Sequence, residues 1–294
     1  MFDKLQWLPD RLVIDDLVLR MEHTKSTHWD GPEHLMFYKT DALITQYDTF
    51  FKSYSYFHPR HVVELGMWDG GSILFWNEVL KPKKIVGIDQ MNREDSTYFK
   101  DYIKSQNLAG QVVTHWKTNQ ADKARLREII ASEFDTPLDF VIDDCSHLYG
   151  PTKASFEILF PQMSSGGWYL IEDWAWGHWP NYITPDHPWR GKTPLTEFVI
   201  ELVKCAGNSP NLFSTLLVLP GFIAVQRGRA TLDLEVDFDL DNYAKYSVKY
   251  DNDPSNRSKE ISASHSSQGF SKSRSLIKRI YNRIIKVISN LTLL

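Results

Sequence analysis

The chain has 294 residues, of which 42% are hydrophobic, and a formal net charge of −4. It is long enough to bury a full-sized core, and without a basic excess it gives no reason to expect a nucleic-acid partner. Its two cysteines, Cys145 and Cys205, predict no disulfide framework and a reducing, cytoplasmic compartment. The first residues mix charged and apolar side chains, which predicts neither a signal peptide nor a membrane span.

Residues 1–58 are rich in aromatic side chains and predict a helical or irregular preamble. The sequence leaves open whether this preamble closes over a site as a lid.

Residues 59–250 alternate short β-branched runs with stretches of helical length. The expected strands are 61–66, 83–89, 111–116, 138–143 and 167–173, and the expected helices include 121–134, 151–163 and 193–207. This alternation is typical of βαβ units and a parallel sheet covered on both faces. Pro220-Gly221 between two further apolar runs predicts a hairpin. The predicted fold class is α/β: a Rossmann-like doubly wound sheet, mainly parallel, with a C-terminal antiparallel hairpin.

The composition changes at residue 251. Residues 251–275 are polar and serine-rich, which predicts a disordered linker. Residues 276–294 predict a basic amphipathic helix that either lies on an anionic membrane surface or packs on its own domain or on a partner subunit.

Glycines follow the first predicted strand of the sheet, at Gly66 and Gly70. A tight strand-to-helix turn needs glycine for its backbone angles and for close approach to a ligand, although a turn without a ligand gives the same pattern. The second predicted strand ends in Asp89, where α/β nucleotide sites hold an acid that accepts hydrogen bonds from ribose. Together the two signals favour a nucleoside ligand.

The motif E-x-G-x-x-x-G, formed by Glu64, Gly66 and Gly70, resembles the S-adenosylmethionine site of class I methyltransferases. VIDDCSH (141–147) and WYLIEDWAWGHWP (168–180) are similar to a narrower family, the metal-dependent sugar O-methyltransferases of the macrolide and rhamnosyl type, which have cephalosporin hydroxylase-like relatives. The resemblance covers about residues 55–180.

This resemblance implies that Asp144, Glu172 and Asp173 ligate a divalent cation and that His147 is the general base. A parallel sheet independently brings the ends of the fourth and fifth predicted strands to one edge, where ligands bind. An all-oxygen set suits Mg²⁺ or Mn²⁺, which would orient two adjacent sugar hydroxyls and lower the pKa of the reacting one. His147 would then take the proton, although a histidine that only supports the loop is the alternative.

The residues predicted to bind the cofactor extend beyond the glycine turn. They are Glu64, Gly66, Gly70, Ser72, Asp89, Gln120, Asp122 and Asp143. Gln120 and Asp122 follow the third predicted strand and are expected to meet the adenine or the ribose. Asp143 either faces the cofactor or supports its loop, and Cys145 is expected to be a packing residue.

Four tryptophans lie within residues 174–190, directly after the predicted metal ligands. Their rings either stack on the C–H faces of a sugar or cover the sheet edge and an oligomer contact. His178 in this segment either lines the acceptor site or is structural.

The sequence therefore predicts an S-adenosylmethionine-dependent, Mg²⁺- or Mn²⁺-dependent O-methyltransferase that acts on a sugar hydroxyl of a glycan or glycosylated metabolite. A homo-oligomer is expected. The alternatives are a same-fold O-methyltransferase for a non-sugar hydroxyl and a non-catalytic nucleotide-binding or assembly protein that retains the fold.

Overall fold

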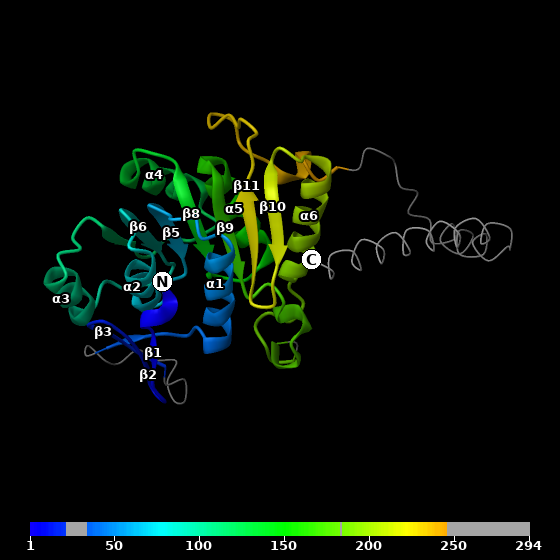
Figure 1. Cartoon of the computed structure of the whole chain (residues 1–294). Helices are drawn as coiled ribbons and strands as arrows, with labels where there is room; N and C mark the ends of the chain where they lie inside the picture. The colour runs from blue at the N-terminus through cyan, green and yellow to red at the C-terminus, as the bar shows by residue number, and fades with distance from the viewer. Residues whose placement is uncertain (22–33, 183, 246–294) are drawn as a thin grey trace, which may run out of the picture. The chain divides into compact units, whose positions relative to one another are not determined.

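A seven-stranded sheet forms the centre of the structure, a computed structural model that describes residues 1–21, 34–182 and 184–245 (Figure 1). Its strands are β5 (His61–Leu65), β6 (Lys84–Ile88), β7 (Val112–His115), β8 (Leu138–Asp143), β9 (Met163–Glu172), β10 (Phe213–Val218) and β11 (Phe222–Arg227). They run in the order β10-β11-β9-β8-β5-β6-β7. β9, β8, β5, β6 and β7 are parallel, whereas β11 and β10 are antiparallel. The predicted fold class is confirmed.

Helices connect the parallel strands. The α-helices of the described residues are α1 (Asp41–Ser53), α2 (Gly71–Leu80), α3 (Thr97–Ser105), α4 (Lys123–Glu133), α5 (Tyr149–Leu159) and α6 (Leu195–Asn208). The 3-10 helices are η1 (Phe2–Lys4), η2 (Phe160–Gln162), η3 (Trp176–His178), η4 (Pro180–Tyr182) and η5 (Leu240–Asn242). Side chains of Thr40, Ser96 and Asp122 accept a backbone N–H at the starts of α1, α3 and α4, which satisfies donors that the helix leaves unpaired.

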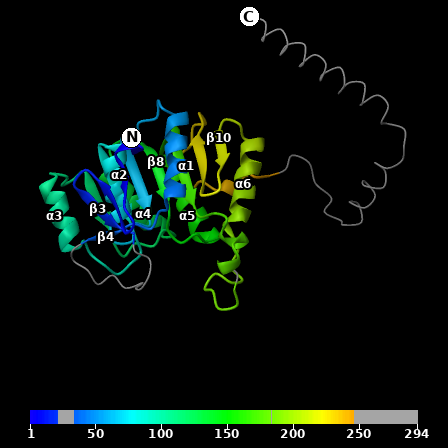
Figure 2. The same ribbon diagram turned by 60° about the horizontal axis from the view of Figure 1, so that its bottom comes forward.

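Alternate residues of the central strands separate two apolar cores. On β9, Trp168 and Leu170 belong to one core, and Tyr169 and Ile171 belong to the other. This is the period of two that a strand imposes on its side chains. α1, α2 and α3 cover the first face of the sheet, and α4, α5 and α6 cover the second (Figures 1 and 2).

A small second sheet occupies the N-terminal segment, where the sequence predicted helix or irregular chain. Its strands are β1 (Gln6–Trp7), β2 (Arg11–Ile14), β3 (Leu17–Arg20) and β4 (Leu35–Met36), in that order. Leu12, Ile14, Leu17 and Leu19 are buried in the first core. Their alternation with more exposed residues has the period of a strand, so the prediction for residues 1–58 is wrong here, and only α1 matches the predicted helix.

Residues 1–245 make up one compact unit, so the described part of the preamble packs with the large sheet. The predicted linker (251–275) and basic helix (276–294) lie outside the described residues. Within the described ranges, no helix is both long and apolar enough to cross a membrane.

Candidate active site

The strand order reverses between β5 and β8, and most of the predicted site residues lie at the carboxyl ends of β5, β6, β8 and β9 around this point. Ligands of doubly wound sheets bind at such a switch point. Gly66, directly after β5, has a φ of +85°, and a Cβ on it would lie 2.1 Å from the backbone oxygen of Asp144. Glycine therefore lets the turn after β5 touch the loop after β8, so the predicted cofactor turn and metal loop share one crevice.

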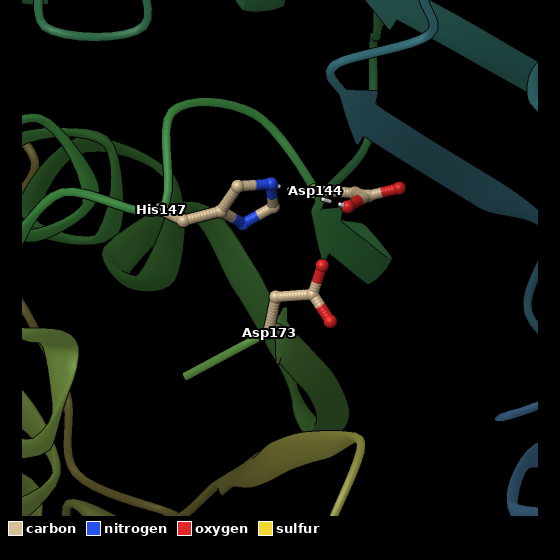
Figure 3. A group of neighbouring side chains, drawn as sticks. All are labelled: Asp144, His147 and Asp173. Carbon is tan, nitrogen blue, oxygen red and sulfur yellow. Dashed lines mark ion pairs between the residues drawn. The ribbon is translucent and has the colours of Figure 1, made fainter. Parts of the chain in front are cut away.

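Asp144, His147 and Asp173 converge in this crevice, with one potential ligand atom from each lying within 4.8 Å of the others. Figure 3 shows the imidazole and the two carboxylates gathered around a common space. His147 Nε2 lies 3.8 Å from Asp144 Oδ1. His147 and Asp173 both have a left-handed backbone, with φ of 54° and 51°, which is uncommon outside glycine. Unusual backbone angles at two members of one cluster are typical of functional sites.

An aromatic segment supports the loop of His147. Trp176 Nε1 donates to the backbone oxygen of His147 at 2.7 Å, and the Trp189 ring meets the imidazole edge-on at 5.6 Å. Tyr182 stacks on Trp189 at 5.4 Å. His178 instead hydrogen-bonds Thr196 near the start of α6 at 2.9 Å. The tryptophans thus border the metal group, while His178 is engaged in a structural contact.

Glu172, predicted as a metal ligand, is placed in a different set of contacts. Its Oε1 accepts from Lys39 Nζ at 2.6 Å and from the Tyr47 hydroxyl at 2.5 Å. Lys39 Nζ also donates to Asp144 Oδ2 at 2.6 Å. The structure therefore divides the predicted metal set: Asp144 and Asp173 join His147, whereas Glu172 lies with a buried lysine and tyrosine.

Sequence reasoning missed Lys39 and Tyr47. Lys39 is only 3% exposed and Tyr47 is fully buried. A lysine at the end of the apolar run Leu35–Tyr38 was the one available signal, since lysine is seldom fully buried unless it is paired.

Burial raises the pKa of two acids of the crevice, Glu172 and Asp173. Burial raises the pKa of Glu172, and the charge of Asp144 raises it further, while Lys39 opposes the shift. Burial also raises the pKa of Asp173, against the influence of His147. For Lys39, burial lowers the pKa, but the carboxylates of Asp144 and Glu172 outweigh burial and keep the ammonium charged. A cation suits this crevice electrostatically.

Glu64, on β5 before the glycine turn, is fully buried, and among the described residues neither of its carboxyl oxygens has a hydrogen-bond partner. Burial raises its pKa to about 8, although Lys39 opposes the shift. The Ser72 hydroxyl, in the first turn of α2, is also buried; it lies close enough to Glu64 to lower the pKa of that carboxyl, but outside hydrogen-bond geometry. Buried polar atoms without partners are rare in native proteins and call for an explanation, such as a ligand.

Asp89 directly follows β6, and its carboxylate holds the glycine turn in shape. Its Oδ2 accepts from the backbone N–H of Trp68 at 2.9 Å, and its Oδ1 accepts from that of Met91 at 2.8 Å. Each carboxylate oxygen can accept a second hydrogen bond, so this role is compatible with the predicted contact to ribose.

The other residues predicted to bind the cofactor have partners inside the protein. Asp143 accepts from Ser155 at 2.8 Å, Tyr169 at 3.0 Å and Gln120 at 3.1 Å. Gln120 Oε1 in turn accepts from the backbone N–H of Ser146 at 2.8 Å. Asp143 and Gln120 thus support the loop after β8, which is the second of the two roles expected for Asp143.

Asp122 is exposed and caps α4 by accepting from the backbone N–H of Arg125 at 3.0 Å.

A separate groove of about 490 Å³ lies along α3 and β7, lined by residues that include Phe99, Ile103 and Thr114. It is at the sheet edge and contains none of the predicted site residues.

The chain belongs to the class of doubly wound α/β proteins, and it has a glycine turn and an acid cluster at the switch point of its sheet. Residues 63–174 match the family model described as a methyltransferase domain. The chain is 32% identical over 178 residues to demethylmacrocin O-methyltransferase of Streptomyces fradiae, covering 58% of this chain and 38% of that protein. It is 30% identical over 128 residues to 8-demethyl-8-alpha-L-rhamnosyl tetracenomycin-C 2'-O-methyltransferase of Streptomyces olivaceus, covering 41% and 30%.

Among solved structures, the chain is similar to the MycE methyltransferase from the mycinamycin biosynthetic pathway in complex with Mg, SAH and mycinamycin VI. The TM-score is 0.47 at 26% identity, covering 63% of this chain and 49% of that one. The chain thus spans less than two fifths of the length of the two curated relatives described above. The sequence matches confirm the predicted resemblance to methyltransferases over the central part of the chain.

Proposed function

We propose that this chain is an S-adenosylmethionine-dependent, divalent-metal-dependent O-methyltransferase that acts on a sugar hydroxyl. The observation that carries the proposal is the cluster of Asp144, His147 and Asp173 at the switch point, next to the turn that follows Glu64. The matches to O-methyltransferases named for macrolide and rhamnosyl substrates support the sugar acceptor.

The carboxylates of Asp144 and Asp173 fit a hard divalent cation. Mg²⁺ is usually held by one or two carboxylates together with oxygens of water or substrate. When bound, the metal would orient two adjacent hydroxyls and lower the pKa of the one that reacts. Such a set leaves the nitrogen of His147 outside the ligands, because Mg²⁺ prefers oxygen.

His147 is the proposed general base. Its Nε2, 3.8 Å from Asp144 Oδ1, would take the proton of the acceptor hydroxyl as the methyl group is transferred. Asp144 would stabilise the resulting imidazolium, and the hydrogen bond from Trp176 to the backbone of His147 would hold the ring in place.

The turn after β5 fits the cofactor. The unpartnered carboxyl of Glu64 would accept from the α-ammonium group of S-adenosylmethionine, and that positive charge would bring its raised pKa back down. Gly66 and Gly70, with φ of +85° and +97°, let the backbone approach the ligand. The half-buried Trp189 ring is the candidate surface for the C–H face of the sugar.

The test is methyl transfer from labelled S-adenosylmethionine to a panel of macrolide glycosides and simple rhamnosides, with Mg²⁺ and with EDTA. Label in the sugar only with Mg²⁺ would support the proposal. Transfer to catechols but not to sugars would favour the non-sugar alternative. Failure to bind S-adenosylmethionine at all would favour the non-catalytic alternative.

We also propose a cytoplasmic location, which the two free cysteines support. The homo-oligomer, and the contact of residues 276–294 with a membrane or partner, stay predictions.

A further inference from the structure

We propose that residues 35–40 couple the binding of the cofactor to the binding of the metal, so that each ligand raises the affinity for the other. This segment, the strap, joins the small sheet to α1 and precedes the matched residues 63–174. The inference rests on the proposed function, because it needs both ligands. It gives the strap a role that is separate from direct contact with either ligand.

The side chains of the strap alternate between buried and more exposed positions. Leu35, Phe37 and Lys39 are buried. Tyr38, between the last two, is exposed. This is the period of two of a strand, in which adjacent side chains point to opposite sides. The Phe37 ring packs on the Phe75 ring of α2 with 4.6 Å between the centroids. Neighbouring residues of the strap can therefore contact two different sites.

One set of contacts joins the strap to the turn after β5, the proposed cofactor turn. The backbone N–H of Met36 donates to Oδ2 of the buried Asp69 at 2.8 Å, and Asp69 Oδ1 accepts from the backbone N–H of Gly71 at 3.1 Å. A Cβ on Gly71 would lie 2.0 Å from the backbone oxygen of Met36. The Tyr38 ring meets the Trp68 ring edge-on at 5.5 Å. The strap thus crosses the cofactor turn in direct contact.

Trp68 links these contacts to the predicted ribose acid. Its backbone N–H donates to Asp89 Oδ2 at 2.9 Å, and the guanidinium of Arg93 lies over its ring at 4.7 Å. A cofactor that binds Asp89 would therefore fix the residue on which Tyr38 packs.

The next residue of the strap reaches the acids of the metal crevice. Lys39 Nζ lies 2.6 Å from Asp144 Oδ2 and 2.6 Å from Glu172 Oε1, and its side chain is only 3% exposed. One ammonium thus orients both carboxylates. Each acid keeps a second oxygen for a metal, since a carboxylate has two acceptor oxygens.

The helix that continues the strap supports Asp173. Thr40 caps α1, and Gln46 on α1 accepts from the backbone N–H of Gly221 at 2.9 Å. The backbone oxygen of Gly221 accepts from the backbone N–H of Asp173 at 3.1 Å. The strap and α1 therefore hold all three acids that the sequence predicted as metal ligands.

These contacts give the coupling its sign. Tyr38 and Lys39 are neighbours, and consecutive Cα atoms are only ~3.8 Å apart, so holding one restricts the other. A cofactor that fixes the turn fixes the strap, and Lys39 then holds the carboxylates in place. The metal binds acids that are already ordered, so less conformational entropy is lost on binding. The same coupling must act in reverse, from the metal to the cofactor.

The experiment measures Mn²⁺ affinity of the full chain by electron paramagnetic resonance, with and without S-adenosylhomocysteine. This product lacks the sulfonium charge, so it does not repel the metal as the cofactor would. We expect it to tighten Mn²⁺ binding about tenfold, and calorimetry should find that Mn²⁺ tightens its binding by the same factor. S-adenosylhomocysteine alone should also slow amide hydrogen exchange of residues 35–40.

Two variants interrupt the strap at its two ends. Tyr38→Ala removes the contact with the cofactor turn, and Lys39→Met removes the contact with the metal acids. Each should reduce the tenfold coupling to less than about threefold, and the double variant should lose no more, because both changes interrupt one path. Tyr56→Ala, at a tyrosine that follows α1 and is 70% exposed, is the matched control and should keep the full coupling.

Wild-type protein that binds both ligands without mutual tightening would overturn the inference and leave the proposed function standing. Wild-type protein that fails to bind Mn²⁺ or S-adenosylhomocysteine would overturn the proposed function itself. Full coupling in folded Tyr38→Ala and Lys39→Met would overturn the role of the strap. If Lys39→Met does not fold, the comparison of Tyr38→Ala with Tyr56→Ala still decides, because both positions are exposed.

Discussion

Two buried glutamates at the switch point have opposite surroundings. Glu172 accepts hydrogen bonds from Lys39 and Tyr47, whereas Glu64 has no partner among the described residues. A buried carboxylate is costly unless it is paired, so Glu172 is completed by the protein itself. Glu64 is completed only by a proton or by a ligand that brings a donor. On the metal side of the crevice, the protein itself supplies the hydrogen-bond donors that Glu172 needs. On the cofactor side, Glu64 obtains a donor only when a ligand binds or when it is protonated.

The largest expected effect is that of Asp144→Ala, which tests whether metal binding and cofactor binding depend on separate residues. Asp144→Ala should abolish metal-dependent methyl transfer, because it removes a carboxylate from the metal group, while calorimetry should find S-adenosylmethionine affinity within about threefold of the wild type. Asp101→Ala, at an exposed position on α3, is the control. Cofactor affinity that falls as far as in Asp89→Ala would show that the two sides are not separate.

The next variant tests whether His147 is the general base or a metal ligand. His147→Gln should lower kcat by about 10²- to 10⁴-fold, since it removes the proposed base, with Mn²⁺ affinity changed by less than about threefold. His178→Gln, whose ring contacts Thr196, should keep most of the activity. A parallel loss of Mn²⁺ affinity in His147→Gln would make the histidine a ligand rather than the base.

Glu64→Gln tests the cofactor side through pH. Because the folded protein raises the pKa of Glu64 from 4.5 to about 8, the folded state holds this proton more tightly than the unfolded state. The free energy of unfolding should therefore fall as pH rises from about 4.5 to 8. Without cofactor, Glu64→Gln should flatten this decline and stabilise the protein at pH 8 by ~1–3 kcal/mol, while cofactor affinity drops.

Urea unfolding across this pH range would measure the effect, with Glu128→Gln, an exposed glutamate on α4, as the control. A slope that Glu64→Gln leaves unchanged would contradict the assignment.

The smallest effect concerns Asp122, which the sequence assigned to the cofactor. As the N-cap of α4 it should contribute only about 1 kcal/mol to stability, so Asp122→Ala should lower the free energy of unfolding by that amount. Calorimetry should find S-adenosylmethionine affinity unchanged. A clear loss of affinity would return Asp122 to the cofactor site.

The sequence predicted the sheet well because its signals are local. Runs such as 61–66 and 138–143 are apolar and bounded by polar or glycine residues, and they became β5 and β8 nearly residue for residue. The N-terminal strands are harder to predict, because β2 and β3 have only four residues each and the aromatic-rich composition of this segment does not distinguish strand from helix.

Within the candidate site, the sequence by itself determined which acids end the strands, since parallel strands bring their carboxyl ends to one edge. It could not decide what each acid faces. Asp143 and Asp144 are neighbours in the chain, yet Asp143 lies with Ser155 and Tyr169 while Asp144 lies with Lys39 and His147. Lys39 is 105 residues before Asp144 and 133 before Glu172. Only the tertiary structure brings them together, because side-chain direction and long-range contact depend on how α1 and its preceding segment pack on the sheet.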